Sequence, residues 1–197
     1  MKVTQLSSET LDRAHERFEE TLAQMTVAEA NTMPAPLIKS VTWLMWHTAR
    51  ELDLQISALN HSEPLWLSQH WTEKFALDLP DETEDWHHTP EEAAKVVVAE
   101  KQLLSDYLAA SVALTKSYLD QIKEEQLSDV IDKNWTPPVT RQVRLVSVID
   151  DAVMHSGQAV YTRRISFLCR RFISNRRSPK ISRIHTTYAF NSFRTFN

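Results

Sequence analysis

Asp151 and His155 have the spacing of two ligands for one metal ion. They lie four positions apart in the stretch "DDAVMHSGQAVYTRR", residues 150–164, and two side chains at this spacing share one face of an α-helix. A carboxylate and an imidazole on adjacent turns can bind one divalent ion together. On a helical wheel Gln158 lies about 60° from His155, on the same side as Asp151. Gln158 could hydrogen-bond a ligand and orient it, or it could simply be exposed.

A third ligand should come from another helix, and His47 is the candidate. It follows four apolar residues in the stretch "WLMWHTAR". In helical bundles, metal sites are built from inward side chains on facing helices. Two imidazoles and one carboxylate suit Zn²⁺, Ni²⁺, Fe²⁺ or Mn²⁺ and leave coordination positions open. The sequence thus predicts a metal site of His47, Asp151 and His155, although spacing alone leaves open that His47 is a packed core residue.

Gly157 is the only glycine in the 197 residues, and its surroundings indicate a helix. A glycine in a helix interior costs about 1 kcal/mol relative to alanine. On the same wheel Gly157 lies about 160° from His155, away from the candidate ligands. We therefore expect this glycine to allow the close approach of another helix rather than to serve the metal.

Four helices must position these residues. Apolar residues recur at three- and four-residue spacing in four long segments, and stretches that contain proline separate them. The predicted helices span residues 8–25, 37–60, 90–125 and 143–170. No segment shows the alternation of a strand. The sequence therefore predicts an all-α fold, specifically a four-helix bundle.

The distribution of charge indicates one domain followed by a different kind of segment. Residues 1–162 hold all 26 acidic residues and 13 basic ones, whereas residues 163–197 hold nine basic and no acidic residues. We assign residues 1–172 to the bundle and 173–197 to a basic tail, and expect the tail to be solvated or interface-forming rather than bound to RNA or lipid. A change of reading frame would also produce such a break. The acidic body argues against nucleic-acid binding by the main domain.

The cysteine content and the hydropathy of the sequence indicate the cellular compartment of the protein. The single cysteine, Cys169, excludes an internal disulfide and suits a reducing environment. The N-terminus lacks the apolar core of a signal peptide, and no run of about 18 apolar residues occurs, the length that predicts a membrane span. We therefore expect a cytoplasmic protein without a membrane partner.

Two stretches resemble the DinB-like superfamily, which includes mycothiol-dependent maleylpyruvate isomerase and the bacillithiol transferases. They are "SVTWLMWHTARELD" and "WTPPVTRQVRLVSVIDDAVMHSGQAVYTRR", and the resemblance covers roughly residues 8–165. It implies a DinB-like four-helix bundle that binds one divalent metal through His47, Asp151 and His155. Asp151 stands where relatives often have Glu or His, and its shorter side chain could bind the metal through a water.

The resemblance also implies a reaction. It would be thiol-dependent S-transfer or isomerisation, in which the metal stabilises the thiolate of a low-molecular-weight thiol cofactor and this thiolate attacks a small-molecule electrophile. The chain's own Cys169 is not needed for this chemistry. Two alternatives are a non-catalytic, stress-related interaction protein that binds metal and a metal-dependent hydrolase. The chain could also form a homodimer.

Other residues are weaker candidates for the site. Trp135, just before the last helix, resembles part of a recurring family segment and could line a pocket or cap a loop. Arg144 and Arg50 could hold an anionic substrate or thiol cofactor, or could form surface ion pairs. The loop "DWHH", residues 85–88, could bind a metal, but histidines next to acids in loops are usually solvated.

Overall fold

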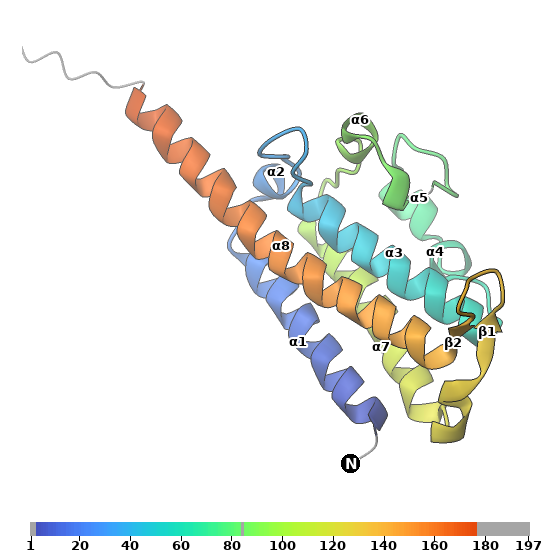
Figure 1. Cartoon of the computed structure of the whole chain (residues 1–197). Coiled ribbons are helices and arrows are strands. Elements are labelled where there is room, and N and C mark those ends of the chain that lie inside the picture. Colours follow the sequence, from blue (N-terminus) through green and yellow to red (C-terminus); the bar gives the residue numbers. More distant parts are fainter. Residues whose placement is uncertain (1–2, 84, 177–197) are drawn as a thin grey trace, which may run out of the picture.

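Four long helices carry the fold in the part of the chain that the computed structural model describes, residues 3–83 and 85–176 (Figure 1). They are α1 (Val3–Ala23), α3 (Val41–Asn60), α7 (Lys101–Gln121) and α8 (Arg141–Arg176). α1 and α3 each pack against both α7 and α8, so the four helices close around one core. The prediction of an all-α fold is confirmed.

Short elements connect the long helices. They are α2 (Val27–Ala30), α4 (Leu65–Ser68), α5 (Trp71–Phe75), a 3-10 turn (Asp85–His87), α6 (Pro90–Ala93), a second 3-10 turn (Glu124–Ser128), and the strands β1 (Val130–Asp132) and β2 (Val139–Thr140). The two strands pair antiparallel, with Val130 opposite Thr140. Strands of two and three residues are too short to show an alternation, so the sequence pattern does not predict this hairpin.

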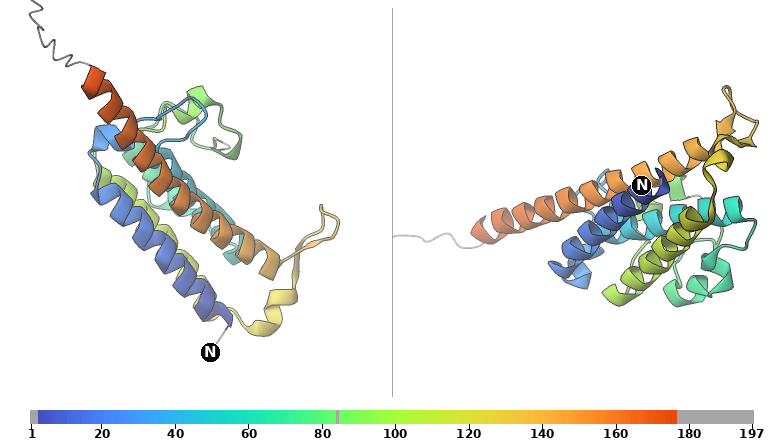
Figure 2. Two further views of the ribbon diagram at one scale, coloured as in Figure 1. Left: turned by 60° about the vertical axis from the view of Figure 1, so that its left-hand side comes forward. Right: turned by 90° about the horizontal axis from the view of Figure 1, so that it is seen from below.

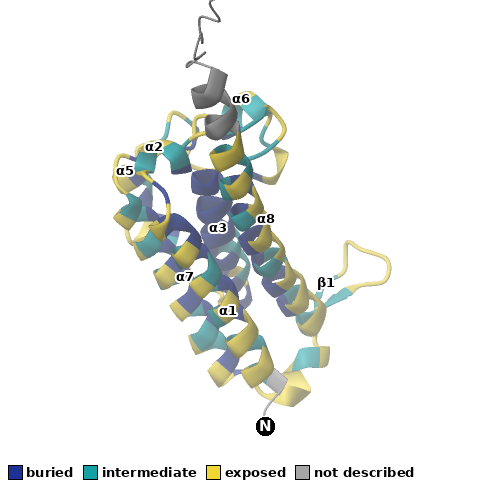
Figure 3. Cartoon of the chain, turned by 90° about the vertical axis from the view of Figure 1, so that its left-hand side faces the viewer, coloured by how far each residue is buried: buried dark blue, intermediate teal, exposed yellow. Residues whose placement is uncertain are grey.

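α3 is enclosed by the rest of the molecule. Ser40 starts the helix, because its Oγ accepts a hydrogen bond from the Trp43 backbone N–H at 3.0 Å. From Val41 to Asp53 nearly every residue is buried, as the dark blue ribbon of α3 shows (Figure 3). A helix that is largely apolar all round belongs in the interior. Any polar side chain on this stretch, His47 included, must therefore find its partners inside the protein.

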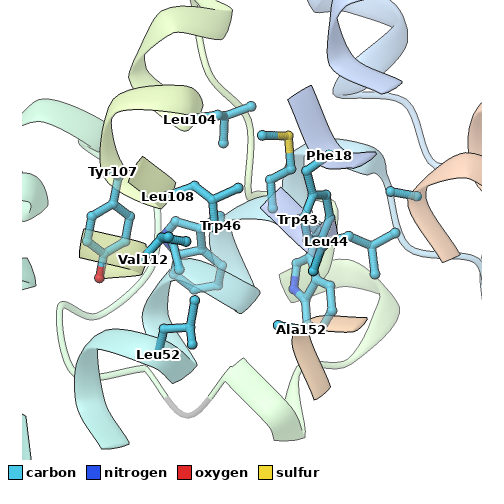
Figure 4. Close-up of a cluster of buried hydrophobic side chains, with 14 of the residues drawn as sticks. Phe18, Trp43, Leu44, Trp46, Leu52, Leu104, Tyr107, Leu108, Val112 and Ala152 are labelled. Carbon is cyan, nitrogen blue, oxygen red and sulfur yellow. The ribbon is translucent and has the colours of Figure 1, made fainter. Parts of the chain in front are cut away.

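The core joins α3 to all three other long helices (Figure 4). Trp46 is fully buried in α3 and lies beside Leu108 of α7, while Phe18 reaches the same cluster from α1. Ala152 brings α8 to it, on the turn next to Asp151. Close packing of these side chains fixes the register of α3 against α8. That register determines which polar residues of the two helices lie next to each other.

The prediction of one helix over residues 90–125 is wrong in its first part. After α6 the chain is not helical until α7 begins. Val96 and Val98 are buried at 0% and 7% exposure, whereas Val97 between them is 44% exposed. The Asn31 side chain fixes this stretch, because it accepts from Val98 N at 3.2 Å and donates to Val98 O at 2.8 Å. Three consecutive β-branched residues suit such an extended segment better than a helix.

α8 runs past the ends of the helices that it packs against (Figure 2). Gly157 lies exposed on it, and a Cβ atom built at this position would meet, outside the adjoining turns of α8, no atom of the described residues within 4 Å. The expectation that Gly157 lets another helix of the chain approach is therefore wrong, because its side of α8 faces solvent rather than α1 and α3.

The boundary between bundle and tail at residue 172 stays a prediction. α8 continues to Arg176, and the rest of the proposed tail lies outside the described residues, as does the side chain of Cys169. None of the helices in the described part of the chain is both long enough and apolar enough to cross a bilayer.

Candidate metal centre

His47, Asp151 and His155 meet where α3 packs against α8. One ligand atom from each residue lies within 4.8 Å of the other two. His155 Nε2 is 3.3 Å from Asp151 Oδ1, and His47 Nε2 is 3.8 Å from Asp151 Oδ2. Tetrahedral ligands with bonds of about 2.1 Å lie about 3.4 Å apart. The structure thus brings the three predicted ligands together at separations near those of a metal site.

Both imidazoles are oriented through the nitrogen that faces away from Asp151. His47 Nδ1 lies 3.0 Å from Asp85 Oδ2, and His155 Nδ1 lies 2.7 Å from Gln158 Oε1. Carboxylate and amide oxygens only accept hydrogen bonds, so each Nδ1 carries the hydrogen and donates it. In the neutral rings the lone pair is then on Nε2, which is the tautomer that a metal ligand needs.

The burial of the group supports a cation as its missing partner. His47 and His155 are only 4% and 9% exposed, and Asp151 Oδ2 is buried without accepting a hydrogen bond from any described residue. A buried carboxylate oxygen without a partner is costly, and a bound cation would remove this cost. Two imidazoles and one carboxylate form a donor set that borderline divalent ions prefer. The residues present therefore fit a divalent metal ion.

The local charge is negative. Glu51 and Asp85 lie with His47 in a second group whose ligand atoms are within 4.8 Å of one another. Burial, followed by the charge of Asp85, raises the pKa of Glu51. Burial alone would lower the pKa of His155, but the hydrogen bond to Asp151 and the Asp151 charge outweigh it, so that pKa is raised. Both shifts have the same meaning: the site favours an added positive charge.

Trp43 holds the two imidazoles in place. Its ring stacks on His47 with centroids 4.5 Å apart and an interplanar angle of 11°. The same ring meets His155 edge-on, at 6.2 Å and 85°. Aromatic contacts of these geometries restrict ring rotation. The ligand rings are thus fixed by packing as well as by hydrogen bonds.

A cavity of about 320 Å³ opens beside Asp151, whose side chain is 28% exposed. Trp135 and Arg144 line this cavity together with Glu51. A second cavity of about 550 Å³ is also lined by Arg144. The Arg144 guanidinium donates to Gln55 Oε1, which lies on both cavities. The structure thus places Trp135 and Arg144 at the solvent side of the candidate ligands.

A sequence model of the DinB superfamily matches residues 10–159, a range that includes all three candidate ligands. The chain belongs to the DinB superfamily. A crystal structure of a conserved protein from Enterococcus faecalis is 97% identical to this DinB protein, covers 85% of this chain and 98% of its own, and superimposes with a TM-score of 0.83. The search of curated proteins found no match.

The loop histidines of this DinB protein lie beside the centre without joining it. His88 Nδ1 accepts a hydrogen bond from Trp43 Nε1 at 3.1 Å, and His88 Nε2 lies 2.7 Å from Thr83 Oγ1. Both ring nitrogens of His88 are therefore used, and burial lowers its pKa. His87 is exposed. Among the described residues, neither histidine belongs to a group that could hold a metal.

Of the two sequence-based expectations for Arg50, the surface ion pair is wrong. It is 3% exposed, so it forms no surface ion pair. Its guanidinium carbon lies 4.7 Å from the ring centroid of Trp66 and 5.9 Å from that of Trp46, within range of cation–π attraction. The cavity that Arg50 lines is a different one from the cavity beside Asp151. Only Arg144 of the two arginines is placed to meet a ligand there.

The sequence analysis does not include Glu51, and it names Asp85 only as part of a loop that could bind a metal, not as a partner of His47. Asp85 comes from a 3-10 turn that shows no periodicity, and only its neighbours His87 and His88 drew attention to that loop. Glu51 carries a signal that could have been used, because it follows His47 at the same four-residue spacing that joins Asp151 to His155. Both residues add negative charge to the DinB site.

Replacing Asp85 by asparagine should weaken metal binding by about 10- to 100-fold. The amide keeps an acceptor near His47 Nδ1 but removes the charge that makes His47 Nε2 a stronger donor to a metal. Competition titration of Zn²⁺ against a chelator measures the change. Asp81→Asn is the matched control, because Asp81 is an exposed aspartate of the same loop; equal affinities for D85N and the wild type would contradict the role of Asp85.

Proposed function

We propose that this DinB protein is a divalent-metal-dependent enzyme that joins a low-molecular-weight thiol to a small electrophile or uses the thiol to isomerise it. One observation carries the proposal: two Nε2 atoms and a carboxylate converge beside a cavity, while the opposite nitrogens of both rings are held by acceptors. An ion bound by three protein ligands keeps a position for substrate. The thiol is supported by the resemblance to thiol-dependent members of the superfamily.

The residues around the cavity suit two reactants. The cavity beside Asp151 and the larger one next to it share Gln55 and Arg144 among their lining residues, which provides room for both a thiol cofactor and an electrophile. The Arg144 guanidinium would bind an anionic group of either reactant. Trp135 would pack against an apolar part of the electrophile. Such thiols are reduced in the cytoplasm, where we place the protein.

The reaction requires a thiol proton to be removed and a carbon–sulfur bond to form. A divalent ion lowers the pKa of a thiol that binds it. Glu51 lines the cavity with a buried Oε1 that has no hydrogen-bond partner among the described residues, and this atom would take the proton. In a transfer, the sulfur would form a bond to the electrophilic carbon while the leaving group departs with the electron pair of its bond to that carbon. In an isomerisation, the sulfur would instead add to one carbon of a double bond, whose π electron pair moves onto the neighbouring part of the substrate. After rotation about the resulting single bond, the double bond would form again and the sulfur would leave.

Substitution of the native ion by Co²⁺ tests whether the metal site binds a thiol. We expect a thiolate-to-cobalt absorption band on addition of bacillithiol, glutathione, coenzyme A or cysteine, and none with serine, the alcohol that matches cysteine. We also expect one of these thiols to be conjugated to monochlorobimane, a fluorogenic electrophile. The band and the product should both be lost in His47→Ala.

The possible failures of this test are distinct. A cobalt protein that gives neither band nor conjugate with any of the four thiols rules out thiol transfer. Hydrolysis of an ester or amide by the metal-loaded protein would then favour the hydrolase. Metal binding with no reaction would favour the stress-related interaction protein.

A further inference from the structure

The solvent side of α8 is a continuous face centred on Gly157. Exposed residues recur along it at spacings of three and four. They are Val143, Val146, Asp150, Met154, Gly157, Tyr161, Arg164 and Leu168. At 100° per residue all of them lie within about 60° of Gly157. We call these eight residues the Gly157 face.

The Gly157 face is unusually apolar for a surface in contact with water. Val143, Val146, Met154, Tyr161 and Leu168 are 53%, 60%, 48%, 65% and 51% exposed. Single exposed apolar residues are common, but a contiguous row of large ones marks an interaction surface. Gly157 lies at the middle of the row and leaves the α8 backbone open to close approach, since no other described segment comes within 4 Å of a Cβ there.

The two charges on the Gly157 face identify the partner. Asp150 lies seven residues before Gly157, and Arg164 lies seven residues after it. Neither side chain forms a hydrogen bond or an ion pair with any other described residue. They are about 21 Å apart along one helix, so they cannot pair within one chain. Two α8 helices that cross antiparallel at Gly157 would bring Asp150 of each copy opposite Arg164 of the other.

We propose that two copies of this chain associate through the Gly157 face, with their α8 helices antiparallel around a twofold axis at Gly157. Such an interface uses the same patch on both copies. Two ion pairs between Asp150 and Arg164 flank a centre in which Met154 of one copy contacts Tyr161 of the other. A shallow crossing of about 20° keeps these pairs in reach, and glycine at the crossing point permits a close helix distance.

The interface lies apart from the candidate metal ligands, although one of its residues, Val143, also lines the cavity beside Asp151. His155 lies about 160° and Asp151 about 120° from Gly157 on the wheel of α8, and both side chains face α3. A dimer built on the Gly157 face therefore leaves the candidate ligands to each copy alone. The proposal does not depend on the identity of the metal or on the thiol.

Sedimentation velocity of the full chain at micromolar concentration tests the assembly. We expect a dimer for the wild type. Asp150→Arg should raise the dimer dissociation constant at least about tenfold, because two arginines then face each other at two places, and Arg164→Asp should have the same effect. The double variant D150R/R164D exchanges the charges and should restore the dimer. A monomeric wild type, or a dimer that D150R leaves intact, would overturn the proposal.

Two further variants separate the interface from general effects. Asp120→Arg reverses an exposed charge on α7, a helix on the other side of the bundle, and should leave the dimer unchanged. Gly157→Leu should produce a monomer with an unchanged far-ultraviolet circular dichroism spectrum and unchanged Zn²⁺ binding, since the added side chain meets only the second copy. A G157L protein that stays dimeric would place the contact elsewhere on the surface and refute the proposed crossing.

Discussion

Replacement of His155 by alanine is expected to abolish stoichiometric binding of a divalent metal while the helical content stays close to that of the wild type. His155 Nε2 is one of three ligand atoms, and it lies nearest to the Asp151 carboxylate, at 3.3 Å. Loss of a direct ligand should weaken binding by at least about 100-fold, the upper end of what loss of a supporting partner costs. Elemental analysis after dialysis and calorimetric titration with Zn²⁺ measure the change.

His87→Ala is the control for the loss of a histidine, because His87 is exposed and belongs to no ligand group among the described residues. It should bind metal as the wild type does. If H155A keeps one equivalent of metal, the site is not where the three side chains converge. If H155A loses its helical circular dichroism signal, the metal is needed for the fold itself and the site is structural.

Replacement of Asp53 by alanine is expected to lower the free energy of unfolding by about 3–5 kcal/mol. Asp53 is fully buried in α3. Its carboxylate accepts the backbone N–H groups of Leu65 and Trp66 at 2.7 Å each and the Tyr107 hydroxyl at 2.9 Å. The Ser57 hydroxyl also donates to it, at 3.2 Å. Alanine removes the acceptor of all four donors, most of which are buried, and a buried donor without an acceptor is costly.

Urea denaturation followed by circular dichroism measures this loss, with Asp106→Ala as the matched control. Asp106 also lies on a long helix and accepts a hydrogen bond from Gln102, but that bond is exposed. Its removal should change stability by no more than about 0.5 kcal/mol. A loss below about 1 kcal/mol for D53A would show that water or a neighbouring group replaces the carboxylate.

Helical periodicity was sufficient to predict which residues share a face. The spacing of Asp151 and His155, and the place of His47 in an apolar run, are properties of single helices that tertiary packing then brings together. Gln158 belongs to the same α8 face, and it accepts from the ring of His155 at 2.7 Å. The sequence predicts the positions of these residues because each lies on a long helix whose register the core fixes.

The features that the sequence does not predict depend on contacts between segments far apart in sequence. Asp85 reaches His47 only because the loop after α5 folds over α3, and no local pattern encodes that path. The extended stretch around Val98 is held by Asn31, which precedes it by many residues. The sequence predicts that Gly157 packs within the bundle, and this is wrong. A helical wheel gives the direction in which a residue points, but not whether another helix or solvent lies in that direction.

The two parts of the candidate site differ in how freely evolution can alter them. His47 and His155 lie on α3 and α8, in a core where most substitutions would create a cavity or a clash. Trp135 and Val139 line the adjoining cavity from the β1–β2 hairpin, where residues 133–138 are all exposed. Surface loops tolerate insertions and exchanges that cores do not. Under the proposed function, new substrate preferences can therefore arise by replacement of this hairpin alone, with the ligand-bearing helices inherited unchanged.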